Sequence, residues 1–235
     1  MATAFAHLRQ GTGDLLERAI LLDLKASILR DQRRFAQAMR LLDRAYSIFM
    51  TYDDSHRAGR VLVNMETVHY SAGRAEQGIS LLYRAIDLID PDEEPFLVLC
   101  VWHNLIDDLA DLGRFVEARD LMTRATPVYG RFQDLATRSR RTSVEGKIAR
   151  GLGQPLEAEA LFLTARNGFL DLDMPFDAAL ISLDLALLYA GQKRILELRS
   201  LAEEMLQIFA AHGIQREALA SAICLQHAVT SARAG

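Results

Sequence analysis

The stretch that decides the fold is residues 101–125, which read VWHNLIDDLADLGRFVEARDLMTRA. Apolar residues recur three or four positions apart on both sides of Gly113, which is the spacing of a helix that buries one face. Glycine can adopt the positive φ that ends a helix, so Gly113 is predicted to lie in a turn. A second helix should begin two residues later, at Phe115. The segment is therefore predicted to be a helical hairpin.

The same pattern recurs along the chain with a 40-residue period. Small or apolar residues late in the second helix form one column, which contains Ala45, Ala85, Ala125, Ala165 and Met205. Two further columns contain Ala38, Gly78, Ala118, Ala158 and Leu198, and Leu42, Leu82, Met122, Phe162 and Ala202. The predicted turns contain Arg33, Gly73, Gly113, Gly153 and Lys193. Small residues suit places where two helix backbones approach closely, so the hairpins are predicted to stack on one another.

These residues resemble the tetratricopeptide repeat, in which an early Trp, a Leu and a small residue are followed by Gly and two spaced Ala. The third hairpin fits best, with Trp102, Leu105, Leu109, Gly113, Ala118, Met122 and Ala125. Ile106 departs from the pattern, because the family prefers Gly or Ala there. The resemblance implies an all-α fold, a right-handed α–α superhelix of five hairpins plus a C-terminal capping helix. It places the repeats near 19–58, 59–98, 99–138, 139–178 and 179–214 and the cap at 215–231, in one domain over 1–235.

The 40-residue period is longer than that of the family repeat, which takes about 34 residues. We expect helices about one turn longer and extended loops between hairpins, as at Tyr52–His56 and Asp90–Pro95. Longer units of this type are similar to those of bacterial sensor and regulator proteins.

The segment Phe5–Leu8 resembles the end of a second helix that has no first helix before it. The chain is therefore expected to start inside a repeat and to be the C-terminal part of a larger protein. The apolar face formed by Ile20, Leu21, Leu24 and Ile28 is then expected to be covered by an upstream segment or by a second copy of the chain.

Composition narrows the classes of function. There are 27 Lys and Arg residues against 31 Asp and Glu, and this net charge of −4 argues against binding of nucleic acid. No leader pattern and no apolar run of about 20 residues occurs, which indicates a cytoplasmic protein that binds no membrane. Cys100 and Cys224 belong to no metal-binding pattern, and no cofactor or metal is expected.

In the family, ligand contacts come from one face of each first helix. Carried over by register, this face supplies Arg60, Asn64, Thr67, His103, Asn104, Asp107, Arg140, Ser143, Lys147 and Asp184. Asn64 and Asn104 occupy equivalent positions, and an amide can give a donor and an acceptor together to an extended peptide. The alternative is that each asparagine only caps a loop or faces water. Likewise Arg140, Lys147 and Arg150 could hold a carboxylate, or could form a solvated helix face.

His103 and Asp107 lie four residues apart on one predicted helix face, but no nucleophile or metal site accompanies them. The sequence therefore predicts no enzyme and favours a non-catalytic scaffold that binds a protein or peptide, as in the interaction module of a bacterial regulator. The alternative is a structural module for self-association. An all-helical enzyme would need a closed pocket with converging titratable groups.

Overall fold

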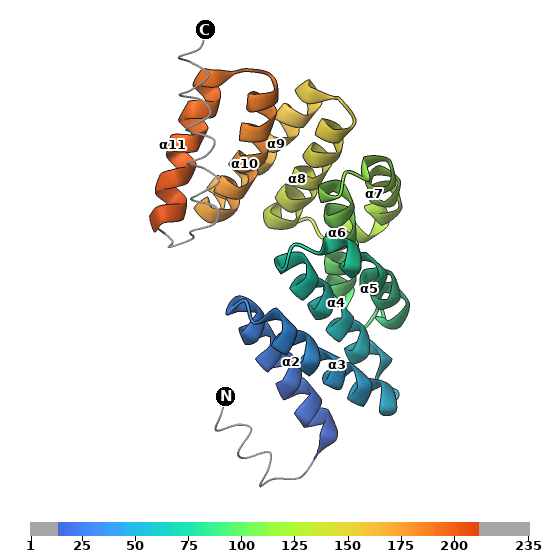
Figure 1. Cartoon of the computed structure of the whole chain (residues 1–235). Helices are drawn as coiled ribbons and strands as arrows, with labels where there is room; N and C mark the ends of the chain where they lie inside the picture. The colour runs from blue at the N-terminus through green and yellow to red at the C-terminus, as the bar shows by residue number, and fades with distance from the viewer. Residues whose placement is uncertain (1–13, 212–235) are drawn as a thin grey trace. The chain divides into compact units, whose positions relative to one another are not determined.

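The computed structural model describes residues 14–211, which form ten α-helices and no strand (Figure 1). The all-helical class is confirmed. The chain divides into two compact units, one up to Leu112 and one from Gly113 onward, and each is described by itself. The predicted single domain over 1–235 stays a prediction. The predicted capping helix at 215–231 lies outside the described residues.

Unit 1 consists of α2 (Leu15–Asp31), α3 (Phe35–Thr51), α4 (Ser55–Ser71), α5 (Ala75–Leu88) and α6 (Pro95–Asp111). Each helix packs against the next one in the chain. The first helices of successive hairpins also contact one another, α2 with α4 and α4 with α6. These three helices form a continuous wall, which we call the unit 1 wall.

Unit 2 consists of α7 (Phe115–Tyr129), α8 (Leu135–Gly151), α9 (Pro155–Asp171), α10 (Pro175–Gly191) and α11 (Ile195–Ala211). Consecutive helices again pack together, and the first helices α8 and α10 contact each other. We call these two helices the unit 2 wall. Helix α8 begins where the Asp134 side chain accepts a hydrogen bond from the backbone N–H of Thr137, at 2.8 Å.

The predicted turns are confirmed residue by residue. All five members of the turn column have positive φ: Arg33 58°, Gly73 72°, Gly113 77°, Gly153 77° and Lys193 58°. A helix begins two residues after each of them, as expected. Three-residue corners thus join the helices of a hairpin.

The same corner also joins some hairpins to each other, at Asp53 and Asp173, which have φ of 55° and 56°. The extended loop expected at Tyr52–His56 was therefore wrong. Helix α4 already begins at Ser55, because the Asp54 side chain caps it by accepting from the Arg57 N–H at 3.0 Å. A six-residue connection does occur at 89–94, where α5 ends early at Leu88. Two 17-residue helices and two corners account for the 40-residue period.

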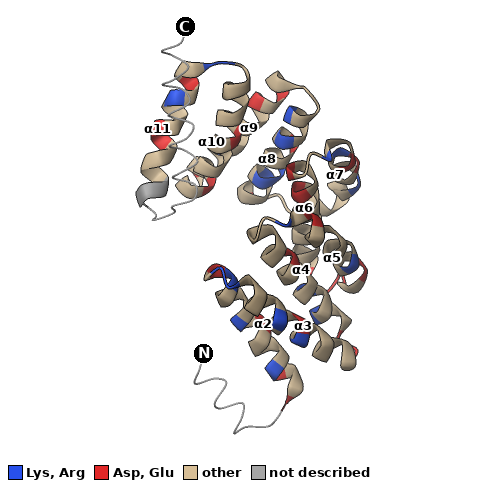
Figure 2. Cartoon of the chain, in the orientation of Figure 1, with Lys and Arg blue, Asp and Glu red and all other residues tan. Residues whose placement is uncertain are grey.

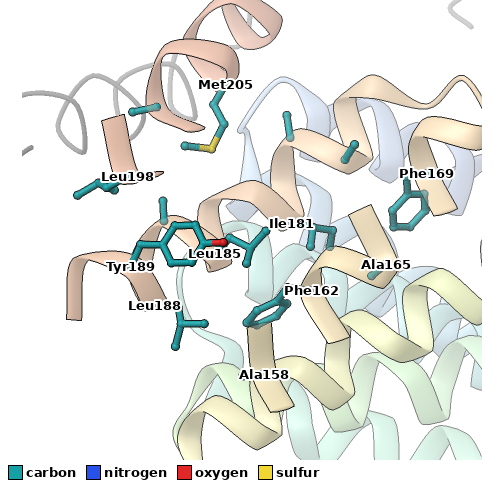
Figure 3. Packing of buried hydrophobic residues seen from close by; sticks show 14 of the residues in the cluster. Ala158, Phe162, Ala165, Phe169, Ile181, Leu185, Leu188, Tyr189, Leu198 and Met205 are labelled. Atoms are coloured by element: carbon teal, nitrogen blue, oxygen red, sulfur yellow. The ribbon is translucent and has the colours of Figure 1, made fainter. Parts of the chain in front are cut away.

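The three packing columns form the core of both units. Every member is buried, and the alanines of these columns have no exposed surface. In unit 2, Phe162 and Phe169 of α9 lie with Leu185 and Tyr189 of α10 and with Met205 of α11 (Figure 3). A Cβ built on Gly146 would come within 2.8 Å of the Phe162 ring, so this ring packs directly against the backbone of α8.

Among the helices of residues 14–211, none combines the length and apolar character that a membrane span requires.

Candidate functional site

Hydrogen bonds between side chains cross the unit 1 wall from one first helix to the next. Asn64 on α4 donates from Nδ2 to Asp23 Oδ1 on α2 at 2.7 Å. Asn104 on α6 donates from Nδ2 to Glu66 Oε2 on α4 at 3.1 Å. We call these four residues the asparagine ladder.

The ladder fixes the orientation of both amides. In their ionised forms Asp23 and Glu66 can only accept, and each then determines which end of its partner amide carries nitrogen. Asn64 and Asn104 are half-buried, and within residues 14–211 neither makes a further hydrogen bond. The amide oxygen and the second N–H of each therefore make no hydrogen bond within this part of the chain.

Both carboxyl groups of the ladder are held in a desolvated environment. Glu66 is 2% exposed, and burial raises its pKa to about 7 although hydrogen bonds from Asn104 and Thr67 act in the opposite direction. The nearby charge of Asp107 raises it further. Burial also raises the pKa of Asp23, against the hydrogen bond from Asn64. Desolvation of this kind is common at functional sites and also occurs in structural networks.

The other predicted residues of the unit 1 wall lie around the ladder. Arg60 is exposed at the start of α4 and forms an ion pair with Glu94. The Thr67 hydroxyl donates to the backbone oxygen of Val63 at 3.0 Å. His103 and Asp107 are half-buried on α6.

The predicted residues of unit 2 lie in a different charge environment. Lys and Arg are numerous on α8, whereas α6 of unit 1 carries Asp residues and no Lys or Arg (Figure 2). Arg140 is exposed and Lys147 is half-buried. Asp184 on α10 accepts from Arg150 Nη1 on α8 at 2.8 Å. Ser143 is only 6% exposed and offers a partner less surface than the others.

Sequence reasoning missed both acceptors of the ladder, Asp23 and Glu66. Asp23 stands one residue before Leu24, the position equivalent to Asn64 in the first repeat. Polar residues next to the repeat position of Asn64 and Asn104 would have pointed to it. Glu66 could have been suspected because a carboxylate interrupts the apolar run of α4.

The described residues contain no group of three or more His, Cys, Asp and Glu side chains placed to hold a metal ion.

No family model and no curated protein sequence matches the chain. Solved structures do match it. A Rap protein complexed with competence and sporulation factor is similar with a TM-score of 0.72 and 14% identity, over 89% of this chain and 58% of that chain. A putative kinesin light chain from Podosopora anserina with nearly identical TPR-like repeats is similar with a TM-score of 0.60 and 16% identity, over 86% of this chain and 98% of that chain.

This chain thus spans little more than half of the Rap protein's length, and identities this low show the fold alone. Together with the stacked hairpins of 40-residue period, these neighbours show that the chain has a tetratricopeptide-like repeat fold.

Proposed function

We propose that this chain is a non-catalytic scaffold that binds a protein or peptide, and that the unit 1 wall holds an extended segment of that partner. The observation that carries the proposal is the asparagine ladder. Two amides stand at equivalent positions of successive first helices, each oriented by a carboxylate of the helix before it.

The chemistry of the amide explains why this arrangement suits a peptide. An extended backbone presents an N–H and a C=O at each residue, and one amide side chain can pair with both. Because Asp23 and Glu66 hold the amides in place, less side-chain freedom is lost when the ligand binds. Selectivity for a particular sequence would then come from side chains around the ladder.

The finer role we propose is the sensory or interaction module of a bacterial regulator in the cytoplasm. The similarity to a Rap protein complexed with competence and sporulation factor supports this role. The basic residues Arg140 and Lys147 of the unit 2 wall would offer a second contact, to acidic groups of the partner.

A second candidate is self-association through α2. Ile20, Leu24 and Ile28 recur every four residues on this helix, and they are 46%, 54% and 41% exposed. Such a row of apolar side chains is typical of a contact surface. Sedimentation equilibrium of the purified chain separates the candidates, since a monomer that binds peptides supports only the first.

The test of the ladder uses peptides selected from a random display library on the immobilised chain. Replacing both asparagines (Asn64→Ala and Asn104→Ala) should weaken binding of a selected peptide about 10- to 100-fold, because up to four hydrogen bonds to its backbone are lost. Fluorescence polarisation of the labelled peptide measures the affinity.

Asn167→Ala is the matched control, because Asn167 is an exposed amide on α9 outside the unit 1 wall. Thermal melts of all variants check folding. Unchanged affinity in a folded double variant would refute the proposed role of the ladder.

A further inference from the structure

A cavity of about 620 Å³ opens in unit 1 next to the asparagine ladder. Its walls come from the middle of α2, the end of α3, the start of α4 and the 89–94 connection. Asp23 belongs both to this cavity and to the ladder. Its volume is in the range of roughly 300–1,000 Å³ that is usual for ligand pockets.

The connection that closes the cavity is fixed to the rest of unit 1. The backbone N–H of Asp90 donates to His56 Nδ1 on α4 at 3.3 Å, and the N–H of Asp92 donates to Asp90 Oδ1 at 2.8 Å. Arg60 of α4 pairs with Glu94 at its far end. The 89–94 connection is therefore held at both ends.

Carboxylates outnumber cationic groups in this cavity. Of its four acidic residues, two are already paired with guanidinium groups: Asp54 with Arg57 at 2.6 Å, and Glu94 with Arg60. Among residues 14–211, Asp23 and Glu93 form no ion pair with a guanidinium group and account for the excess of carboxylates. Glu93 Oε2 lies 3.6 Å from His56 Nδ1, the same nitrogen that accepts from the Asp90 N–H.

The cavity also has an apolar side, formed by Ile20 and the buried Phe49. Lys and Arg side chains combine an apolar stem with a charged head, and they bury the stem along such surface. A metal ion would not use the apolar side, and within residues 14–211 no cluster of metal ligands exists.

We propose that this cavity binds the guanidinium side chain of an arginine carried by the peptide. The inference rests on the proposed function, since Asp23 places the cavity beside the amide of Asn64 that would hold the peptide backbone. Asp23 and Glu93 provide the charge, and Ile20 packs against the stem. The planar guanidinium can also form two parallel hydrogen bonds with one carboxylate, which a lysine cannot.

The burial of Asp23 supports this assignment. Burial raises the pKa of this carboxyl, because it removes part of the solvation of the carboxylate charge at a cost in free energy. An incoming guanidinium would compensate for that cost, and Asp23 Oδ2 accepts no hydrogen bond within the described part of the chain.

The probes are acetylated and amidated pentapeptide mixtures in which one position is fixed and the other four are random. Each of the five positions is fixed in turn as arginine, as citrulline or as glutamate. Citrulline has the shape of arginine without its charge. Fluorescence polarisation should show one position at which the arginine mixture binds about tenfold tighter than the citrulline mixture, with glutamate the weakest.

The double variant Asp23→Asn and Glu93→Gln should bring the arginine and citrulline mixtures to within about twofold of each other. The amide introduced on α2 keeps an oxygen that can accept from Asn64, so the ladder stays intact while both excess charges are removed. Asp87→Asn is the matched control, because Asp87 is an exposed carboxylate on α5 outside the cavity. It should leave the preference for arginine unchanged, and thermal melts check that each variant is folded.

Equal binding of arginine and citrulline at every position, or no binding of any mixture, would overturn the inference. A preference that survives in the folded double variant would do so too. The two proposals fail differently: if the ladder has no role, Asn64→Ala with Asn104→Ala leaves all affinities unchanged while the arginine preference persists. If only the cavity assignment is wrong, that variant weakens every mixture and no position favours arginine.

Discussion

The two walls are both built from the first helices of successive hairpins, but the side chains that these helices carry differ. In unit 1, amides donate to carboxylates across the first helices, to the half-buried Asp23 and the buried Glu66, and α6 contributes three Asp residues and no Lys or Arg. In unit 2 the corresponding contact is an ion pair between Arg150 and Asp184, and Leu187 is 58% exposed on α10. Asp184 stands at the repeat position of Asn64 and Asn104. The buried columns therefore keep the 40-residue period, whereas the wall positions vary independently of the fold.

The largest effect is expected from the buried columns, and one of them can be tested in both units. Phe162→Ala should lower the free energy of unfolding by about 4 kcal/mol, and Leu82→Ala by about 3 kcal/mol, because each leaves a cavity in a fully buried site. Urea denaturation followed by circular dichroism measures both.

Leu156→Ala is the control, since Leu156 is 80% exposed and its loss should cost less than about 0.5 kcal/mol. Hydrogen exchange should show reduced protection mainly in unit 2 for Phe162→Ala and mainly in unit 1 for Leu82→Ala. Costs below about 1 kcal/mol in both core variants would contradict the assignment of this column to the core.

A smaller effect on stability is expected from the unit 1 wall, and this effect depends on pH. Burial raises the pKa of Glu66 from 4.5 to about 7 in the folded protein, so between these values the folded state binds more protons than the unfolded state. Stability should then decrease as the pH rises from about 4.5 to about 7, by about 3 kcal/mol, and Glu66 should contribute little further change above that range.

Glu66→Gln should remove this contribution and make the protein more stable at pH values above that range. Chemical denaturation at a series of pH values, for the wild type and this variant, measures the difference. Parallel stability profiles of the two proteins would show that Glu66 is not the titrating group.

The smallest effect concerns the corners, which should behave alike in both units. Arg33 in unit 1 and Lys193 in unit 2 have positive φ, which side chains disfavour and glycine tolerates. Arg33→Gly and Lys193→Gly should each stabilise the protein by about 0.5 kcal/mol, whereas Gly73→Ala should destabilise it by about 1 kcal/mol. Thermal melts of the three variants provide the check, and a destabilised Arg33→Gly would argue for a contact of the arginine side chain that outweighs the strain.

The sequence predicted those features that depend on local chemistry and on the period. The corner at Gly113 and the buried Ala125 follow from a residue type at a fixed spacing, and both were confirmed. The corner at Asp53 was missed, although Asp tolerates positive φ better than most residues.

The partners of the wall could not be predicted in the same way. Asn64 pairs with a residue 41 positions earlier and Asn104 with one 38 positions earlier, so neither pairing follows the 40-residue period. Which carboxylate each amide reaches depends on the offset between helices and on side-chain length. Ser143 shows the same limit, because it is only 6% exposed although the repeat register had assigned it to the unit 2 wall.

The early end of α5 shows how this architecture can acquire a new loop. Most helices here share one length and are followed by a three-residue corner, whereas α5 is a turn shorter and is followed by a six-residue connection. Helices nevertheless start at one constant interval throughout, from Leu15, Phe35 and Ser55 to Ile195. Unwinding a helix end thus releases backbone for ligand contact without inserting residues, and the helical phase of every later repeat is preserved.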